Sequence, residues 1–196
     1  MQLYYNVTSP YTRKVRIVLH EKGLFDRTEQ ILVDPWSDPA MLHAAVPVGR
    51  VPALVTDDGL VLGESTTICD YLDSLPSVGL GGASLIGRDR WPVMARTAVA
   101  QGIIDASFAI AIEARRPEAL RSAETVARHK RAILRILAGA EAKDGRFDLG
   151  DISLAAALGY LDLRVQDVGW RQARPDIAAW YGIASQRPSM LATKPA

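Results

Sequence analysis

The chain places a chemically distinctive turn between an apolar strand and a cationic helix. Ser9-Pro10-Tyr11-Thr12 follows a strand-like segment at residues 2–5 and begins a helix predicted over residues 10–22. Pro10 suits the first helical turn, where its missing N–H would have no partner anyway. The turn has the register of a C-x-x-C redox motif with hydroxyls in place of both sulfurs. Dithiol exchange is therefore disfavoured, whereas a hydroxyl at a helix N-terminus can hydrogen-bond a thiolate brought by a ligand.

The spacing of apolar residues predicts two different parts of the chain. In the first part, strands are expected at 28–33, 53–56 and 60–62, and helices at 10–22, 40–45 and 64–76. In the second part only helical patterns occur, at about 89–115, 118–141, 149–168 and 175–187. The Gly-, Ser- and Pro-rich stretch between them is typical of an interdomain linker. We therefore expect an α/β domain at 1–76, a linker at 77–88 and an all-α domain at 89–196.

Two helices carry more specific signals. In the first helix, Val15, Val18 and Leu19 form an apolar stripe, and the neighbouring cations, among them Lys14, are expected to point elsewhere. At the start of the helix predicted over 149–168, Asp148 and Asp151 have the three-residue spacing of a capping box.

Composition limits the function classes. The 196 residues include 23 basic and 22 acidic residues, and a formal net charge of +1 argues against nucleic acid or an anionic membrane as the main partner. No uninterrupted apolar stretch has the length of a membrane span, and the N-terminal residues lack a signal-peptide pattern, so we expect a soluble, intracellular protein. Cys69 is the only cysteine, and the three histidines lack zinc-type spacing, so neither an internal disulfide nor a metal site is expected.

Taken in order, these features resemble the glutathione S-transferase family over essentially the whole chain, and in particular its short, bacterial cytosolic type with serine at the catalytic position. The resemblance implies a thioredoxin-like N-terminal domain that binds glutathione and an all-α C-terminal helical domain that supplies most of the electrophile pocket. It implies that glutathione is the co-substrate, that its thiolate is conjugated to a small electrophile in a detoxification reaction, and that the protein is a cytoplasmic homodimer.

The resemblance also implies roles for individual residues. Ser9 is the catalytic candidate, predicted to stabilise the glutathione thiolate rather than to act as a nucleophile. A cis Val51-Pro52 bond would turn the Val51 backbone towards the cysteinyl part of glutathione, whereas the simpler interpretation is that the proline begins an edge strand. Arg50 corresponds to a position near the glycyl part.

Glu64 and Ser65 stand at a helix start, where free N–H groups and the helix dipole favour a carboxylate. Ser65 and the helix N-terminus would bind the γ-glutamyl carboxylate, and Glu64 would bind the adjacent ammonium group. The alternative is a plain N-cap with a solvated glutamate.

Several departures and alternatives remain open. Pro10 and Tyr11 stand where isomerase-type members carry Ser and Cys, which disfavours maleylacetoacetate isomerisation. Serine rather than cysteine at position 9 disfavours thiol transfer and dehydroascorbate reduction, and Cys69 is expected to be a buried structural thiol. The alternative hydroxyl donors to a thiolate are Tyr4, Tyr5 and Tyr11.

The electrophile pocket is the least defined part of the prediction. The apolar residues available for it on the helix at 89–115 also fit simple core packing: Trp91, Met94, Ile104 and Phe108. Asp105 either reaches a neighbouring subunit's glutathione, as in some family dimers, or is a surface charge. The rival functions are glutathione-dependent dehalogenation or isomerisation, a non-catalytic glutathione-binding or protein-interaction module, and a glutaredoxin-like reductase that uses Cys69.

Overall fold

The computed structural model describes residues 1–77, 83–88, 90–142 and 145–195 and divides into two compact units. The first unit is Met1–Arg88 together with Pro188–Ala196, and the second is Asp89–Arg187. The domain limits 1–76, 77–88 and 89–196 stay a prediction. The first compact unit is larger than the predicted first domain, because it also includes the described linker residues and the C-terminal segment.

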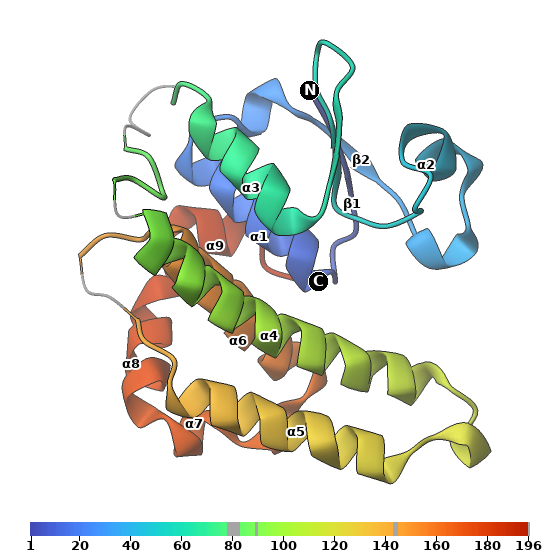
Figure 1. Cartoon of the computed structure of the whole chain (residues 1–196), viewed down its shortest axis with the longest axis vertical. Helices are drawn as coiled ribbons and strands as arrows, with labels where there is room; N and C mark the ends of the chain where they lie inside the picture. Colours follow the sequence, from blue (N-terminus) through green and yellow to red (C-terminus); the bar gives the residue numbers. More distant parts are fainter. Residues whose placement is uncertain (78–82, 89, 143–144, 196) are drawn as a thin grey trace. The chain divides into compact units, whose positions relative to one another are not determined.

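The first unit is built on a four-stranded mixed sheet (Figure 1). Its strands, in the spatial order β2-β1-β3-β4, are β2 (Glu29–Leu32), β1 (Gln2–Tyr5), β3 (Ala53–Val55) and β4 (Val61–Gly63). β1 is parallel to β2 and antiparallel to β3, and β3 is antiparallel to β4. Each strand lies within about one residue of its predicted position, and Gly59 provides the positive φ of the turn after β3. The sheet is thus the mixed α/β sheet that the sequence predicts.

Two helices of this unit carry the candidate site. α1 (Pro10–Glu21) and α3 (Ser65–Ser74) contact each other and run side by side with their N-termini at the same end (Figure 1). The predicted stripe of α1 is buried in the core, with Val15, Val18 and Leu19 at 0% exposure. Arg13 and Lys14 are buried as well, because α1 is covered on more than its apolar side. The remaining short elements are η1 (Phe25–Arg27), η2 (Pro35–Ser37) and α2 (Ala40–Ala45).

A short C-terminal helix, α9 (Pro188–Ala192), also packs on α1. The Ser189 hydroxyl donates to the Glu21 carboxylate at 2.6 Å, and the Arg13 guanidinium donates to the Met190 carbonyl at 3.4 Å. The predicted helical pattern ended at residue 187, so this helix was missed. It explains why Arg13 is buried.

The described end of the predicted linker is fixed to the first unit. The Asp73 carboxylate accepts hydrogen bonds from the Ser84 hydroxyl at 2.6 Å and from the N–H groups of Leu85 and Ile86 at 2.6 and 3.1 Å. It also pairs with the buried ammonium of Lys22 at 3.4 Å. Leu85 and Ile86 are buried, so the middle of residues 83–88 packs on the first unit, while residues 83, 84 and 88 are exposed. Residues 78–82 of the predicted linker lie outside the described part.

Within its described residues, the second unit contains helices joined by loops and no strand. Its elements are α4 (Arg90–Arg115), η3 (Glu118–Leu120), α5 (Ala123–Ala138), α6 (Leu149–Arg164), η4 (Gln166–Val168), α7 (Trp170–Ala173) and α8 (Pro175–Ala184). The pattern at 118–141 is broken because Ser122 caps a new helix by accepting from the Thr125 N–H. α4 is long and apolar enough to cross a membrane, but it packs against α5 and α6 as a core helix does.

The predicted capping box at the start of α6 is confirmed. The Asp148 side chain accepts from the N–H groups of Gly150 and Asp151, and the Asp151 side chain accepts from the Asp148 N–H. Arg96 of α4 pairs with both buried carboxylates. Gly150 makes room for this arginine, because a Cβ at this position would lie 3.0 Å from atoms of Arg96, whose side chain would have to shift by a few tenths of an ångström. α6 is therefore anchored to α4 at its first turn.

Candidate functional site

Ser9 is the N-cap of α1, and its hydroxyl has a defined orientation. Its Oγ accepts a hydrogen bond from the Thr12 N–H at 3.2 Å, and its backbone carbonyl accepts from the Arg13 N–H at 3.0 Å. A serine hydroxyl has one proton to donate and two lone pairs. Because the cap uses a lone pair, the proton is left for a ligand group at the end of the helix.

Asn6 holds the loop that leads to Ser9. Its side-chain amide donates to the Val33 carbonyl at 3.0 Å, and its side-chain oxygen accepts from the Thr8 N–H and hydroxyl at 3.1 and 2.9 Å. The Ser9 N–H donates to the Asn6 carbonyl at 3.2 Å. Sequence reasoning missed Asn6, although Asn favours turns because its side chain can bond the backbone N–H two residues further on. The turn is thus fixed at both ends.

The loop before β3 contains the predicted cis Val51-Pro52 bond. The Val51 side chain packs on a core cluster that includes Tyr4 and Ala53, whereas its backbone N–H and C=O have no backbone partner within the described ranges. These two groups are therefore available for an extended peptide ligand. Arg50, next to them, is exposed.

Gly49 lets this loop lie close to the His43 side chain of α2, because glycine has no Cβ. Its φ is +62°, and a Cβ there would lie 2.5 Å from Cε1 of His43. His43 is held in turn by the Asp38 carboxylate at 2.5 Å. The position of Arg50 and Val51 therefore depends on a glycine that the sequence analysis did not single out.

Glu64 is itself the N-cap of α3. Its carboxylate accepts from the N–H groups of Thr66 at 3.0 Å and Thr67 at 3.1 Å, and from the Ser65 hydroxyl at 3.1 Å. The simpler of the two sequence interpretations, an N-cap, thus describes Glu64 in the ligand-free chain. Glu64 has a φ of +63°, a conformation that is uncommon outside glycine and often marks a functional position.

The ionisation of Glu64 is controlled by opposing effects. Burial raises the pKa of the carboxyl, but the hydrogen bonds from Thr66, Thr67 and Ser65 and the charge of Lys14 together lower it below the ordinary value. Glu64 is therefore anionic at neutral pH. An anionic carboxylate at this point can accept an ammonium group as well as cap the helix.

Lys14 joins the two helices that carry Ser9 and Glu64. Its side chain is fully buried, and its ammonium group donates to the Thr66 hydroxyl at 3.0 Å. Sequence reasoning missed this contact, because nothing in the spacing of a single helix shows which neighbour a lysine meets.

The alternative donors and Cys69 occupy different surroundings. Tyr4 is buried in the core, Tyr5 lies under the Arg16 guanidinium at 4.7 Å, and Tyr11 lies in the first turn of α1. Cys69 is fully buried as predicted, and burial raises the pKa of its thiol to about 12. A neutral, inaccessible thiol of this kind is unsuited to redox exchange.

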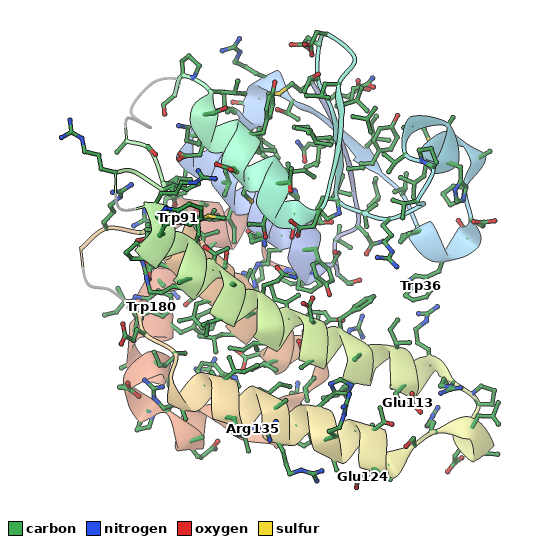
Figure 2. All side chains as sticks on the ribbon, viewed as in Figure 1. Trp36, Trp91, Glu113, Glu124, Arg135 and Trp180 are labelled. Atoms are coloured by element: carbon green, nitrogen blue, oxygen red, sulfur yellow. The ribbon has the colours of Figure 1, made fainter. Side chains whose placement is uncertain are left out.

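The pocket candidates of the second unit lie along α4. Trp91, in its first turn (Figure 2), is 77% exposed, whereas Ile104 is completely buried and is a core residue. Met94 and Phe108 are half-buried. Asp105 lines a hollow of about 420 Å³ together with Arg128, His129 and Arg135 of α5. Within the described residues, no cluster of side chains could hold a metal ion.

The mixed sheet, with two capped helix N-termini at one end, and a helical second unit define a thioredoxin-like protein with a candidate ligand site at that end of the sheet. Two family models match the chain: the N-terminal domain of glutathione S-transferase at residues 8–75 and its C-terminal domain at residues 113–182. The chain belongs to the glutathione S-transferase family.

Individual relatives agree with this assignment. An uncharacterized GST-like protein of Escherichia coli K12, YibF, is 31% identical and covers 100% of this chain and 98% of its own. A glutathione transferase family member from Pseudomonas fluorescens Pf-5, crystallised with bound glutathione, is 42% identical with a TM-score of 0.92 over 100% of this chain and 98% of its own. A structure of a family member from the same strain with bound S-(propanoic acid)-glutathione is 41% identical, with a TM-score of 0.88 over 100% of both chains.

Proposed function

We propose that this protein is a glutathione transferase that conjugates the glutathione thiolate to a small electrophile. The observation that carries the proposal is the pair of capped N-termini, Ser9 on α1 and Glu64 on α3, joined by the Lys14–Thr66 contact. Two helix N-termini at one end of a sheet favour anionic groups. Glutathione carries two carboxylates and, in its reactive form, a thiolate.

Each predicted binding residue has a role in this arrangement. At the N-terminus of α3, Ser65 binds the γ-glutamyl carboxylate through its backbone N–H and through its hydroxyl, which turns from the Glu64 carboxylate to the ligand. Glu64, still held by the N–H groups of Thr66 and Thr67, binds the neighbouring ammonium. The Val51 backbone pairs with the cysteinyl residue in the manner of an added strand. Arg50 lies near the glycyl carboxylate.

Ser9 donates its hydroxyl proton as a hydrogen bond to the thiolate, which attacks the electrophilic carbon. A C–S bond forms, and either a leaving group departs with the bonding electron pair or the electrons move onto an activated double bond, which is then protonated. A free thiol with a pKa of about 8.5 is only about 3% ionised at neutral pH, so complete ionisation raises the thiolate population at most ~30-fold. Nucleophilicity also falls as the pKa falls. Most of the acceleration must therefore come from positioning of the electrophile.

The remaining features of the proposal rest on family membership. We assign the protein to the cytoplasm, as a homodimer that acts in detoxification, with a glutathione-binding domain at 1–76 and a helical domain at 89–196. Of the pocket candidates, Met94 and Phe108 are retained because their side chains are half-buried, while Ile104 is assigned to the core.

The test is turnover with a panel of electrophiles, with the conjugates identified by mass. The proposal predicts conjugates whose formation depends on glutathione and falls strongly in Ser9→Ala. Retention on immobilised glutathione with no conjugate from any electrophile would instead support the non-catalytic binding module. Loss of a leaving halide or isomerisation without net conjugation would support the dehalogenase or isomerase alternatives.

A further inference from the structure

The contact between α1 and α3 contains a buried ammonium group to which the proposed chemistry gives no role. Lys14 is 0% exposed, and its Nζ donates to the Thr66 Oγ1 at 3.0 Å. Removing a charge from water is costly, and an apolar side chain of similar length would fill the same space without that cost. The presence of a lysine here therefore calls for an electrostatic or positional reason.

Thr66 connects Lys14 to Glu64. The Thr66 hydroxyl accepts from Lys14, and the Thr66 backbone N–H donates to both carboxylate oxygens of Glu64 at 3.0 Å. Lys14 thus holds the residue whose backbone orients the Glu64 carboxylate. It also acts on that carboxylate directly, because its positive charge favours the ionised form.

Further carboxylates lie along α3: Asp70 in its second turn and Asp73 near its end, where Asp73 pairs with Lys22. Asp70, Asp73 and Glu64 disfavour ionisation of the Cys69 thiol, whereas Lys14 favours it. Of these carboxylates, Glu64 is the one at the start of α3, and Lys14 supplies positive charge beside it through its contact with Thr66. Without it, a ligand carboxylate that approaches the start of α3 would meet a more negative surface.

The position of Lys14 along α1 also matters. Lys14 is four residues after Pro10, so it lies on the same helix face one turn beyond the residues capped by Ser9. Its bond to Thr66 therefore ties the second turn of α1 to the first turn of α3. The separation between Ser9, which faces the thiol, and Glu64-Ser65, which faces the other end of the peptide, depends on this contact.

We propose that Lys14 is a positioning residue that makes the site selective for thiols bearing a γ-glutamyl group. The inference rests on the proposed function, and it adds a residue and a specificity to it. Lys14 contacts no part of the ligand: it fixes Thr66, and through Thr66 the Glu64 carboxylate and the start of α3. A thiol peptide without the γ-glutamyl group does not contact Glu64 or the start of α3, so its binding does not depend on Lys14.

Calorimetric titration with glutathione and with the dipeptide Cys-Gly tests the inference. Cys-Gly retains the thiol and glycyl carboxylate but lacks the γ-glutamyl group. Lys14→Met and Thr66→Val should each weaken glutathione binding about tenfold, the order of a hydrogen bond to a charged group, with Cys-Gly affinity unchanged. Thr66→Ser keeps the hydroxyl and should bind glutathione like the wild type. The double variant should lose little more than Lys14→Met alone, because both changes break one linkage.

Circular dichroism and the unfolding midpoint establish that each variant is folded, and if Lys14→Met is not, Thr66→Val decides the question. Equal weakening of both ligands would mean a general structural role and would overturn the inference. Unchanged glutathione affinity in Thr66→Val, or equal losses in Thr66→Ser and Thr66→Val, would also overturn it. A wild-type protein that binds no glutathione would refute the proposed function itself, and the wild-type titration separates that outcome from the others.

Discussion

The backbone N–H of Thr12 donates a hydrogen bond to the hydroxyl oxygen of Ser9, 3.2 Å away. The same oxygen atom of Ser9 therefore caps α1 and belongs to the candidate catalytic hydroxyl. The hydrogen bond fixes where the hydroxyl lies without using its proton. Ser9 therefore has both a structural role and a chemical one, and variants can separate them.

Ser9→Ala should lower the free energy of unfolding by about 1 kcal/mol, the usual cost of losing an N-cap side chain. Ser9→Asp retains the cap and should be close to the wild type in stability. Its carboxylate has no proton to donate and repels a thiolate, so conjugation should fall in both variants, by at most ~30-fold in Ser9→Ala and by more in Ser9→Asp. Urea unfolding and turnover measured on the same preparations check this, and full activity in Ser9→Asp would exclude donation by the hydroxyl.

Glu64 should contribute pH-dependent stability. Because its folded-state pKa lies below the unfolded value, the contribution is present above the ordinary glutamate pKa of about 4.3 and is lost as the pH falls through the lower, folded-state pKa. Glu64→Gln should therefore be less stable than the wild type at neutral pH, with the difference shrinking in acid. Thermal unfolding across this pH range measures it. A difference that stays constant down to the lowest pH would show that ionisation of Glu64 is not involved.

Gly49→Ala should disturb the loop that carries Arg50 and Val51. It combines the cost of a positive φ, about 1–2 kcal/mol for a residue with a Cβ, with a contact of 2.5 Å to His43. Gly59→Ala is the matched control, since Gly59 also has a positive φ but has no atom within 4 Å of the added Cβ. Gly49→Ala should lose more stability than Gly59→Ala and should alone weaken glutathione binding. Equal effects on binding would argue against a role for this loop.

Asp148→Ala should be among the more destabilising changes in the second unit. It removes the N-cap of α6. It also removes one of the two carboxylate partners of Arg96, whose side chain is only 13% exposed. Breaking a buried pair from one side costs about 3–5 kcal/mol. Glu124→Ala breaks a pair in which both side chains are exposed and should cost less than about 1 kcal/mol. Denaturant unfolding of the two variants compares them, and similar small losses would show that the Arg96 linkage adds little.

Much of the fold follows from local signals in the sequence. The strands, the turn at Gly59 and the capping box at Asp148 depend on neighbouring residues, and the structure has them where these signals predict. α9 and the burial of Leu85 and Ile86 were not predicted, because these parts are held by distant partners: Glu21 for Ser189, and Asp73 for Leu85 and Ile86. A Gly- and Pro-rich composition describes how a segment can bend, not what it packs against.

The site was predictable in its parts but not in its connections. The position of Ser9 at a helix start follows from capping preferences, whereas those preferences favour Ser65 over the observed Glu64 as the N-cap of α3. The family resemblance supplied the cis bond at Val51. The Lys14–Thr66 contact joins residues 52 positions apart, and only the packing of α1 on α3 reveals it. That packing also explains why a lysine expected to point away from the core is buried.

The measurement that tests the account most directly is the ultraviolet thiolate absorbance of bound glutathione as a function of pH, in the wild type and in Ser9→Ala. The account predicts a thiol pKa in the wild-type complex about one to two units below the free value of about 8.5, and a value closer to 8.5 in the variant. Glutathione must be saturating in both, so that a change in affinity does not imitate a change in ionisation. The same pKa in both proteins, close to that of free glutathione, would contradict the role assigned to Ser9.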